Sequence, residues 1–383
     1  MKYKLFIICS LLFATMIAQA QSCYAPDTAQ AIIFFTTTGR PPVLESEFSI
    51  SDTTKVHFAS GNLLYQPSTK TWRLAPRQYD IVGGYCSQAP VGTHGTIWEY
   101  ITNTTTNKKE WTRCTNDNTH NASYEGWIDL FAWGTSGWYG TEPEIGEVAY
   151  NATTSERNSH NPKKKVTAAP YEVNNSSANY KLNGIGSQGF DGDWANADWG
   201  VFNNVMLGGT PDSMFRTPTL TEATYLFGGR PHAHELRARA RIRIPGAPGK
   251  PDTLINGVIL LPDDWNPAIL PADFSFKSDA DGCEFYSDNE YTSTVFDMYL
   301  EPQGAIFLPA AGGMSGQTSI KCNRSGYYWG ATPCESNAGR TYDLQFGGYD
   351  ASGVIHSDQT ERRYCRAVRL VAEIKVTPPE PEP

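Results

Sequence analysis

The chain has 383 residues, a formal net charge of −9 and eight cysteines, and 40% of its residues are hydrophobic. A negative net charge without a basic cluster argues against a nucleic-acid-binding protein. No stretch beyond the N-terminus approaches the roughly 20 apolar residues that a membrane-spanning helix needs, so we expect no transmembrane segment.

The N-terminus has the pattern of a secretory signal peptide over residues 1–20. Two lysines precede an apolar run over 5–17, and the small-residue pattern Ala-Gln-Ala ends at Ala20. Cleavage there removes both lysines, so the formal charge changes from −9 to −11. We therefore expect an exported protein, either extracellular or at the cell surface.

Cys23 offers a second route to the surface, as the acylated cysteine of a lipoprotein. Three positions before this cysteine stands Ala20, not the large aliphatic residue expected there, and Gln21 adds a bulky amide before Ser22. The sequence therefore favours ordinary cleavage after Ala20 over lipid attachment at Cys23.

Seven cysteines remain after cleavage, so an exported chain would keep at least one unpaired thiol unless Cys23 is acylated. The expected pairs are Cys86 with Cys114, Cys322 with Cys334, and Cys283 with Cys365. The first pair would close a polar loop rich in Thr and Asn, which stabilises by about 3 to 4 kcal/mol in the chain-entropy model. The second would clip the turn beside an expected strand over 327–330, and the third would be a long-range bridge.

The pattern predicts one large domain over 45–375 with an insertion around 84–122. Gly, Pro, Asn, Ser and Thr recur every 8 to 12 residues or so, which is typical of many short strands joined by turns. A leader over 21–44 precedes the domain, and a Pro/Glu-rich tail over 376–383 follows it. The apolar residues 31–35 of the leader are either an edge strand of the core or a strand donated to a partner.

Several segments have the composition of short strands, and they are 55–58, 72–74, 236–244, 258–261, 305–308, 342–346 and 367–374. Helices are expected to be few and short. The clearest covers 219–227, where Thr219 and Glu222 have the spacing of a capping box, and a second covers 198–205.

Catalytic motifs do not stand out. The sequence lacks a nucleophile elbow, a phosphate-binding loop and a zinc-binding HExxH helix. The glycine-rich run over 312–316 lacks the lysine of a phosphate-binding loop and is expected to be a flexible turn. These features favour a protein that is not an enzyme, with an enzyme of unknown class as the less favoured alternative.

Candidate metal ligands are sparse. His232 and His234 would share one face of a strand, but zinc needs three or four ligands. Four aspartates near turns are candidate oxygen ligands for calcium, namely Asp263, Asp264, Asp279 and Asp281. Neither pair belongs to a complete calcium loop, and Asp also closes turns. We therefore expect no cofactor, with calcium as an open possibility.

Four arginines alternate with apolar residues over 237–243. On a strand, this alternation would place all four guanidinium groups on one face and bury the other face. Such a face would suit an anionic glycan, because guanidinium groups bind sulfate and carboxylate. The simpler alternative is a solvated strand paired with acidic neighbours, which the negative net charge favours.

The segment GWIDLFAWGTSGWYG, over 126–140, places three tryptophans, a phenylalanine and a tyrosine between glycines. Aromatic rings bury large areas and glycines allow tight turns around them, so the segment predicts an ordered, loop-rich core.

Together with other motifs, this segment resembles a group of exported bacterial domains, the FISUMP or "major paralogous" type. The matching motifs in chain order are GNL (61–63) with YQ (65–66), WRLAPRQYD (72–80), GWIDLFAWGTSG (126–137), DWGV (198–201), 216–227, NGVILLPDDW (256–265), GAIFLPAAG (304–312), GYYWGAT (326–332) and VRLV (368–371). The resemblance implies an α+β domain with a C-type lectin-like fold, shared with formylglycine-generating enzymes. It also implies that C-terminal strands and loops present a ligand-binding face.

The chain departs from this family pattern in two places. Residues 84–122 lengthen the usual link between two motifs, and Cys365 stands where glycine is more usual, which favours a local disulfide. The closely spaced cysteine pair that formylglycine-generating activity requires is absent from the C-terminal part of the sequence.

The sequence thus predicts a secreted or cell-surface, non-enzymatic binding domain that recognises a glycan or a surface protein. The polar and aromatic positions expected to face the ligand are Asp343, Gln345, Tyr349, His356, Arg363 and Tyr364. Stacking on tyrosine and charge-assisted hydrogen bonds would hold the ligand. The alternative is an adhesin or pilus-tip subunit, whose leader or tail would join a surface assembly.

Overall fold

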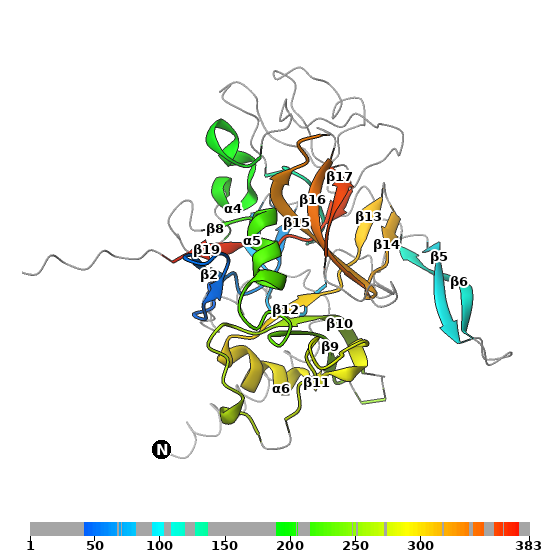
Figure 1. The fold of residues 1–383 in the computed structure, drawn as a ribbon. Coiled ribbons are helices and arrows are strands. Elements are labelled where there is room, and N and C mark those ends of the chain that lie inside the picture. Colours follow the sequence, from blue (N-terminus) through cyan, green and yellow to red (C-terminus); the bar gives the residue numbers. More distant parts are fainter. Residues whose placement is uncertain are drawn as a thin grey trace, which may run out of the picture.

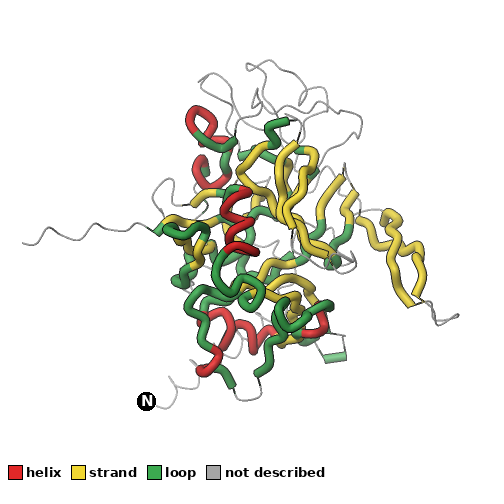
Figure 2. Tube along the Cα trace, in the orientation of Figure 1, coloured by secondary structure: helices red, strands yellow, loops and turns green. Residues whose placement is uncertain are grey.

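In a computed structural model, the described part of the protein consists mainly of short β-strands with a few short helices between them. The structure describes residues 42–66, 69, 71–81, 94–102, 109–118, 127–136, 189–203, 205, 215–246, 248–249, 252–271, 274–315, 318–336, 340–347, 356–362 and 364–374. Only the backbone is described over 94–102, 109–118, 193–194, 314–315, 318–320 and 356–358. The mixed α+β class is confirmed, and Figure 2 shows strands outnumbering helices.

The strands of the described part of the chain form four larger sheets and two hairpins. The first sheet has the strand order β1 (Phe48–Ser49), β2 (Lys55–Phe58), β19 (Val371–Glu373) and β8 (Phe215–Arg216), and the second has the order β11 (Glu290–Thr292), β9 (Arg237–Ile244), β10 (Thr253–Leu260) and β12 (Ile306–Pro309). The third sheet has the order β14 (Thr318–Ile320), β13 (Gly313–Ser315), β18 (Cys365–Arg366) and β7 (Phe131–Ala132). The fourth has the order β15 (Ser325–Pro333), β16 (Arg340–Gly347) and β17 (His356–Glu361). The hairpins are β3 (Leu63–Gln66) with β4 (Thr71–Leu74), and β5 (His94–Thr102) with β6 (Lys109–Asn118).

The helical segments within the described residues are short. They are η1 (Gly192–Ala197), α4 (Trp199–Phe202), α5 (Leu220–Thr224), η2 (Tyr225–Gly229), η3 (Pro267–Ile269), η4 (Tyr286–Asp288), α6 (Ser293–Val295), η5 (Phe296–Leu300) and η6 (Glu301–Gln303). Figure 1 shows α5 in front of β15 and α6 below β9 and β10. The helices therefore cover sheet faces and do not form a bundle of their own.

The aromatic segment around Trp133 forms the centre of one hydrophobic cluster, as its composition predicts. Trp133 stacks on Phe190 with ring centroids 4.3 Å apart, and its indole N–H donates to the Gly330 carbonyl over 2.9 Å. The indole of Trp329 donates to the Phe131 carbonyl over 2.6 Å. The indole N–H groups are thus satisfied by backbone carbonyls of distant strands, which holds the loop in one conformation.

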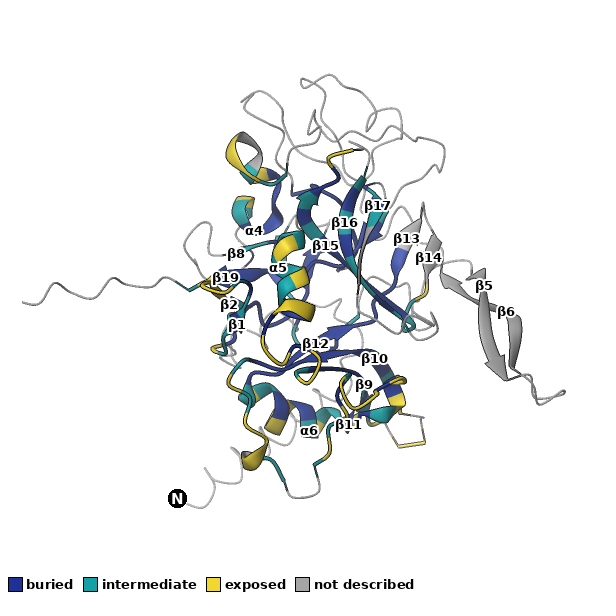
Figure 3. Ribbon diagram, viewed as in Figure 1, coloured by how far each residue is buried: buried dark blue, intermediate teal, exposed yellow. Residues whose placement is uncertain are grey.

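The core continues between the sheets. Residues on both faces of β10 and β12 are buried, and Figure 3 shows these strands in dark blue near the centre of the protein. Gly257 permits this close packing, because a Cβ atom there would overlap the Leu308 carbonyl. Exposed residues are found on α5 and on the turns around β9 and β10.

Most strand predictions are confirmed within a few residues. One predicted turn and one predicted strand differ from the structure. The expected turn over 312–316 contains strand β13, which pairs with β18 at Met314 and Cys365. Among the described residues of this run, only Gly312 adopts a left-handed conformation, with a φ of 71°. Over 367–374, only β19 is a strand, because residues 367–370 instead cross the core and bond to several elements.

The expected insertion around 84–122 contains the antiparallel pair β5–β6. Figure 1 shows this pair projecting from the rest of the fold, beside β14. The signal peptide, the leader before residue 42 and the tail after residue 374 lie outside the described residues.

Candidate ligand-binding surfaces

The predicted ligand-facing residues separate into three groups. Asp343 and Gln345 lie on β16, the middle strand of its sheet, and Tyr364 lies just before β18. His356 begins β17, opposite Gln345, and only its backbone is described. Tyr349 and Arg363 lie outside the described residues.

Asp343 does not face a ligand, contrary to the prediction. The residue is 1% exposed, and its carboxylate forms an ion pair with Arg366 of β18, with 3.1 Å between Oδ2 and Nε. Gln345 donates from Nε2 to the other carboxylate oxygen over 2.9 Å. The carboxylate therefore fixes neighbouring side chains, because a buried charge needs partners of this kind.

A set of side chains around Arg366 forms what we call the C-terminal cluster, consisting of Lys321, Tyr327, Gln345, Tyr364 and Arg366. The guanidinium carbon of Arg366 lies 4.3 Å from the ring centroid of Tyr327 and 5.2 Å from that of Tyr364. The ammonium of Lys321 lies 5.8 Å from the ring centroid of Tyr327. The cluster is a stack of cations and aromatic rings fixed from below by Asp343.

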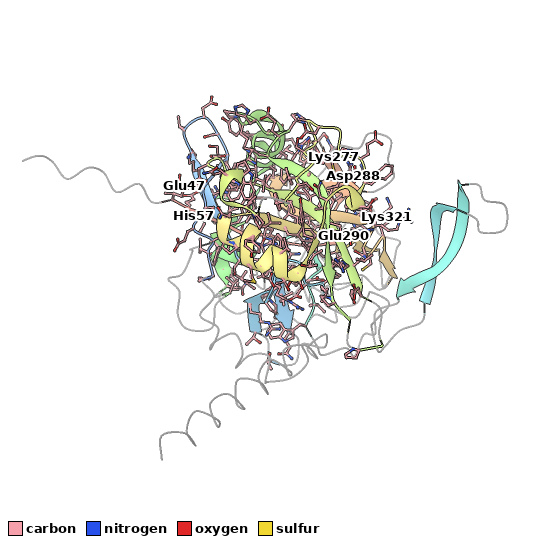
Figure 4. The ribbon with its side chains drawn as sticks, turned by 90° about the horizontal axis from the view of Figure 1, so that it is seen from below. Glu47, His57, Lys277, Asp288, Glu290 and Lys321 are labelled. Carbon is pink, nitrogen blue, oxygen red and sulfur yellow. The ribbon has the colours of Figure 1, made fainter. Side chains whose placement is uncertain are left out.

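The outer members of the cluster are accessible. Tyr364 and Gln345 are half-buried, and Lys321 is exposed. Figure 4 shows Lys321 on the side of the molecule from which the β5–β6 pair projects. Lys321 adopts a left-handed backbone conformation with a φ of 54°, which is uncommon for a residue with a side chain.

The structure contradicts two of the three predicted disulfide bonds. Cys283, Cys334 and Cys365 are buried and do not form disulfide bonds, so Cys322 does not pair with Cys334, and Cys283 does not pair with Cys365. Cys322 is disulfide-bonded, and its partner lies outside the described side chains. The side chains of Cys86 and Cys114 are also outside them, so that pairing stays a prediction.

Packing explains why these thiols stay apart. Cys365 is held in β18 between β7 and β13, opposite Ala132 and Met314. Cys283 lies beside β9, where its thiol donates to the Arg239 carbonyl over 3.5 Å. Burial raises the pKa of the Cys283 thiol to about 11, so this thiol is protonated and inert at neutral pH.

The two histidines of the HAH motif lie in a turn, not on a strand as expected. His232 has a φ of 58°, and its Nδ1 lies 3.0 Å from a Glu235 carboxylate oxygen. The partner of His234 is a different residue, because its Nδ1 lies 3.1 Å from Arg237 Nη2. Within the described part of the chain, no group of three His, Cys, Asp or Glu side chains is placed to hold a metal ion.

Acidic neighbours pair with most arginines of β9, as the simpler alternative predicts, but Arg237 and Arg239 are buried, so the strand is not solvated as that alternative expects. Arg237 pairs with Asp279 over 2.8 Å, and Arg241 pairs with Glu290. Arg243 pairs with both Glu290 and Asp252. The fourth guanidinium, on Arg239, is buried and donates to the backbone carbonyls of Gly347 and Cys283.

A second surface, which no sequence motif predicts, is an open groove of about 710 Å³. Its floor and walls carry three aromatic side chains, Trp265, Phe274 and Phe276. The polar lining residues are Ser49, Lys55, His232, Glu235 and Asp263. We call this set the aromatic groove.

Three separate parts of the chain build the aromatic groove. The β1–β2 hairpin supplies one wall, the turn over 231–236 supplies the second, and the segment after β10 supplies the third. Asp263 joins them, because its carboxylate accepts hydrogen bonds from the Ser49 backbone over 2.9 Å and from Arg230 over 2.8 Å. The aromatic rings belong to the sequences LPDDW (261–265) and FSF (274–276), and only the fold brings them to the turn at His232.

A smaller apolar cavity lies beneath α5. It has a volume of about 50 Å³ and is lined mainly by core side chains such as Phe58, Leu226 and Tyr328. It has room for little more than water, so we assign it to packing.

Among the described residues, no helix is long and apolar enough to cross a membrane. Searches for similar proteins add no family to these observations, because no family model, curated protein or solved structure matches the chain.

Proposed function

We propose that this chain is an exported, non-enzymatic binding domain that recognises a glycan or a surface protein through the C-terminal cluster. The observation that supports the proposal best is the guanidinium of Arg366, held between two tyrosine rings and against the Asp343 carboxylate. Arg and Tyr are the residue types that contribute most at binding surfaces.

Rigidity strengthens this interpretation. Arg366 is 5% exposed and its Nε is bonded, so the stack is ordered before a ligand arrives. A preorganised site loses less conformational entropy on binding. Gln345 and Tyr364 then present a hydrogen-bonding amide and an aromatic ring, beside the exposed ammonium of Lys321. A hydroxyl-rich or acidic ligand surface would complement this combination.

The test is binding of the full chain to a broad glycan array and to intact cells, each with and without calcium. We expect the double variant Lys321→Ala, Tyr364→Ala to weaken binding by about tenfold or more, because truncation of a hot-spot residue costs over 1 kcal/mol. Tyr299→Ala, at an exposed aromatic residue outside the cluster, is the matched control.

The melting temperature separates binding from folding. The double variant should melt close to the parent protein, whereas Asp343→Asn should melt lower because it leaves Arg366 without its buried charge partner. Unchanged binding by the double variant would place the ligand elsewhere. The alternative of an adhesin or pilus-tip subunit depends on the leader and tail, and it stays a prediction.

A further inference from the structure

We propose that the aromatic groove is a separate binding site for a neutral saccharide. It shares no lining residue with the C-terminal cluster. Its size lies in the range of small-molecule sites, which are commonly about 300 to 1,000 Å³. The groove therefore offers room for a short oligosaccharide, and its surface chemistry selects among ligand classes.

The aromatic rings are held in place while part of each stays exposed. Trp265, Phe274 and Phe276 are each half-buried and pack against the cluster that includes Tyr291. Phe274 stacks on Tyr291 with centroids 5.4 Å apart and an angle of 11° between the rings. Fixed, flat apolar surfaces of this kind suit the C–H face of a pyranose ring, because contact excludes water without requiring a hydrogen bond.

Free hydrogen-bonding groups border these rings. Glu235 contacts His232 Nδ1 through Oε2, and neither Oε1 nor the second histidine nitrogen has a hydrogen-bond partner in the part of the chain that the structure describes. The indole N–H of Trp265 has no acceptor among the described residues. Hydroxyl groups both donate and accept hydrogen bonds, so a sugar can satisfy an acceptor carboxylate and a donor indole within one small ligand.

The charges in the groove already have partners within the protein. Lys55 pairs with Glu47 over 3.1 Å and lies 3.7 Å from Asp263. Figure 4 labels Glu47 at the edge of the molecule, next to His57. Asp263 also pairs with Arg230, whose side chain is fully buried. Among the described residues, Glu235 is paired with a histidine and not with a lysine or arginine, so the groove carries no excess positive charge and favours a neutral ligand over a sulfated one.

The wall at His232 is held in an uncommon conformation. The residue has a φ of 58°, and its carbonyl accepts hydrogen bonds from both Glu235 and Leu236 over 2.9 Å. A left-handed residue with a side chain costs energy and persists only where its surroundings fix it, often at ligand sites. Here it directs the His232–Glu235 pair toward the groove that both residues line.

The test is calorimetric titration of the full chain with neutral tetrasaccharides of glucose, mannose, galactose and N-acetylglucosamine at millimolar concentration. A sulfated heparin tetrasaccharide and a proline-rich peptide are titrated in parallel. We expect at least one neutral sugar to bind, and Trp265→Ala to weaken its binding about tenfold, as loss of a central aromatic contact does. Trp265→Phe should retain most of the affinity, because it keeps an aromatic face.

Phe285→Ala removes an exposed aromatic ring outside the groove and is the matched control. The proposal is overturned if no neutral sugar binds, if only the sulfated sugar or the peptide binds, or if Trp265→Ala binds as the parent does. The variants of Lys321 and Tyr364 should bind the same sugar normally. Failure of the groove and failure of the C-terminal cluster are therefore distinguishable.

Discussion

Asp198 is a fully buried carboxyl group that caps the start of α4. Its Oδ1 accepts a hydrogen bond from the Gly200 backbone over 2.9 Å, and its Oδ2 accepts one from the Thr217 backbone over 2.7 Å. Burial nevertheless raises the pKa of Asp198 from 3.8 to about 6, because the hydrogen bonds offset only part of the desolvation. Ionisation of this side chain is thus harder in the folded state than in the unfolded state.

This difference predicts a pH-dependent stability. Below the unfolded pKa of 3.8 the group is protonated in both states, and its stabilising contribution is lost as pH rises through the folded pKa near 6. The loss is up to about 3 kcal/mol in unfolding free energy. We expect the stability of Asp198→Asn relative to the parent to rise by this amount between pH 4 and pH 7, measured by urea unfolding.

An exposed aspartate provides the control. Asp264→Asn should show no such rise over the same range, because residue 264 is solvent-exposed. A constant difference between Asp198→Asn and the parent across the range would show that the buried carboxyl titrates normally. Both variants remove one carboxylate, so their formal charges remain matched.

Residue-level prediction from sequence failed at Asp343 for a definite reason. Strand periodicity correctly places Asp343 and Gln345 on one face of β16. Periodicity does not tell which face of the strand is buried. The side chain that pairs with Asp343 is Arg366, which belongs to strand β18 of another sheet. The alternation of arginines on β9 was likewise visible, but the carboxylates of Asp279 and Glu290 that pair with them come from other segments.

At the scale of elements, the start of α5 shows how local sequence determines a local structure. Thr219 accepts a hydrogen bond from the Glu222 backbone through its side chain, and Glu222 accepts one from the Thr219 backbone over 2.8 Å. Both bonds satisfy N–H groups that the first helical turn leaves open. The capping box predicted from spacing is therefore confirmed.

Removal of this cap should destabilise the protein. We expect Thr219→Ala to lower the unfolding free energy by about 1 kcal/mol, while Thr219→Ser stays close to the parent, because serine keeps the hydroxyl. Thr224→Ala makes the same chemical change at an exposed position within α5 and should be neutral or slightly stabilising. Equal losses for Thr219→Ala and Thr219→Ser would contradict a role for the hydroxyl.

Other elements were predictable only in part. The strand over 55–58 and the arginine strand β9 follow from alternation, and both are found close to their expected bounds. The helix that begins with α5 continues as the π-helical segment η2, so its expected end at 227 is near the observed end. The glycine-rich run over 312–316 looked like a turn, but its strand β13 pairs with β14, which follows directly in the chain, and with β18, about 50 residues later.

The aromatic groove, likewise, could not be predicted from the sequence. Its three walls come from segments that are far apart in the sequence, and no single motif contains its aromatic rings and its polar groups together. Sequence reasoning identified the aspartates at 263 and 264 as turn residues or calcium ligands. It could not reveal that Asp263 joins the β1–β2 hairpin to the turn after η2.

At the scale of the whole molecule, the end of the described chain completes the core. Strand β19 lies between β2 and β8, and thus pairs with segments from near the start and from the middle of the chain. Just before it, Arg369 is buried and donates to the carbonyls of Ala59 and Phe307. These long-range contacts mean that the fold cannot form in sequence order from its N-terminus.

The position of β19 predicts a sharp effect of truncation. A chain ending after Leu370 loses Val371 and Ala372, which are buried, and leaves two strands without their shared neighbour. We expect this chain to show no cooperative thermal transition by circular dichroism, because exposed strand edges and a lost core segment remove more than the small net stability of a folded domain. A chain ending after Ile374 keeps β19 and should melt as the parent does. Cooperative melting of the shorter chain at the parent temperature would show that β19 is dispensable, and the sheet order β1-β2-β19-β8 would then not be what joins the two ends of the domain.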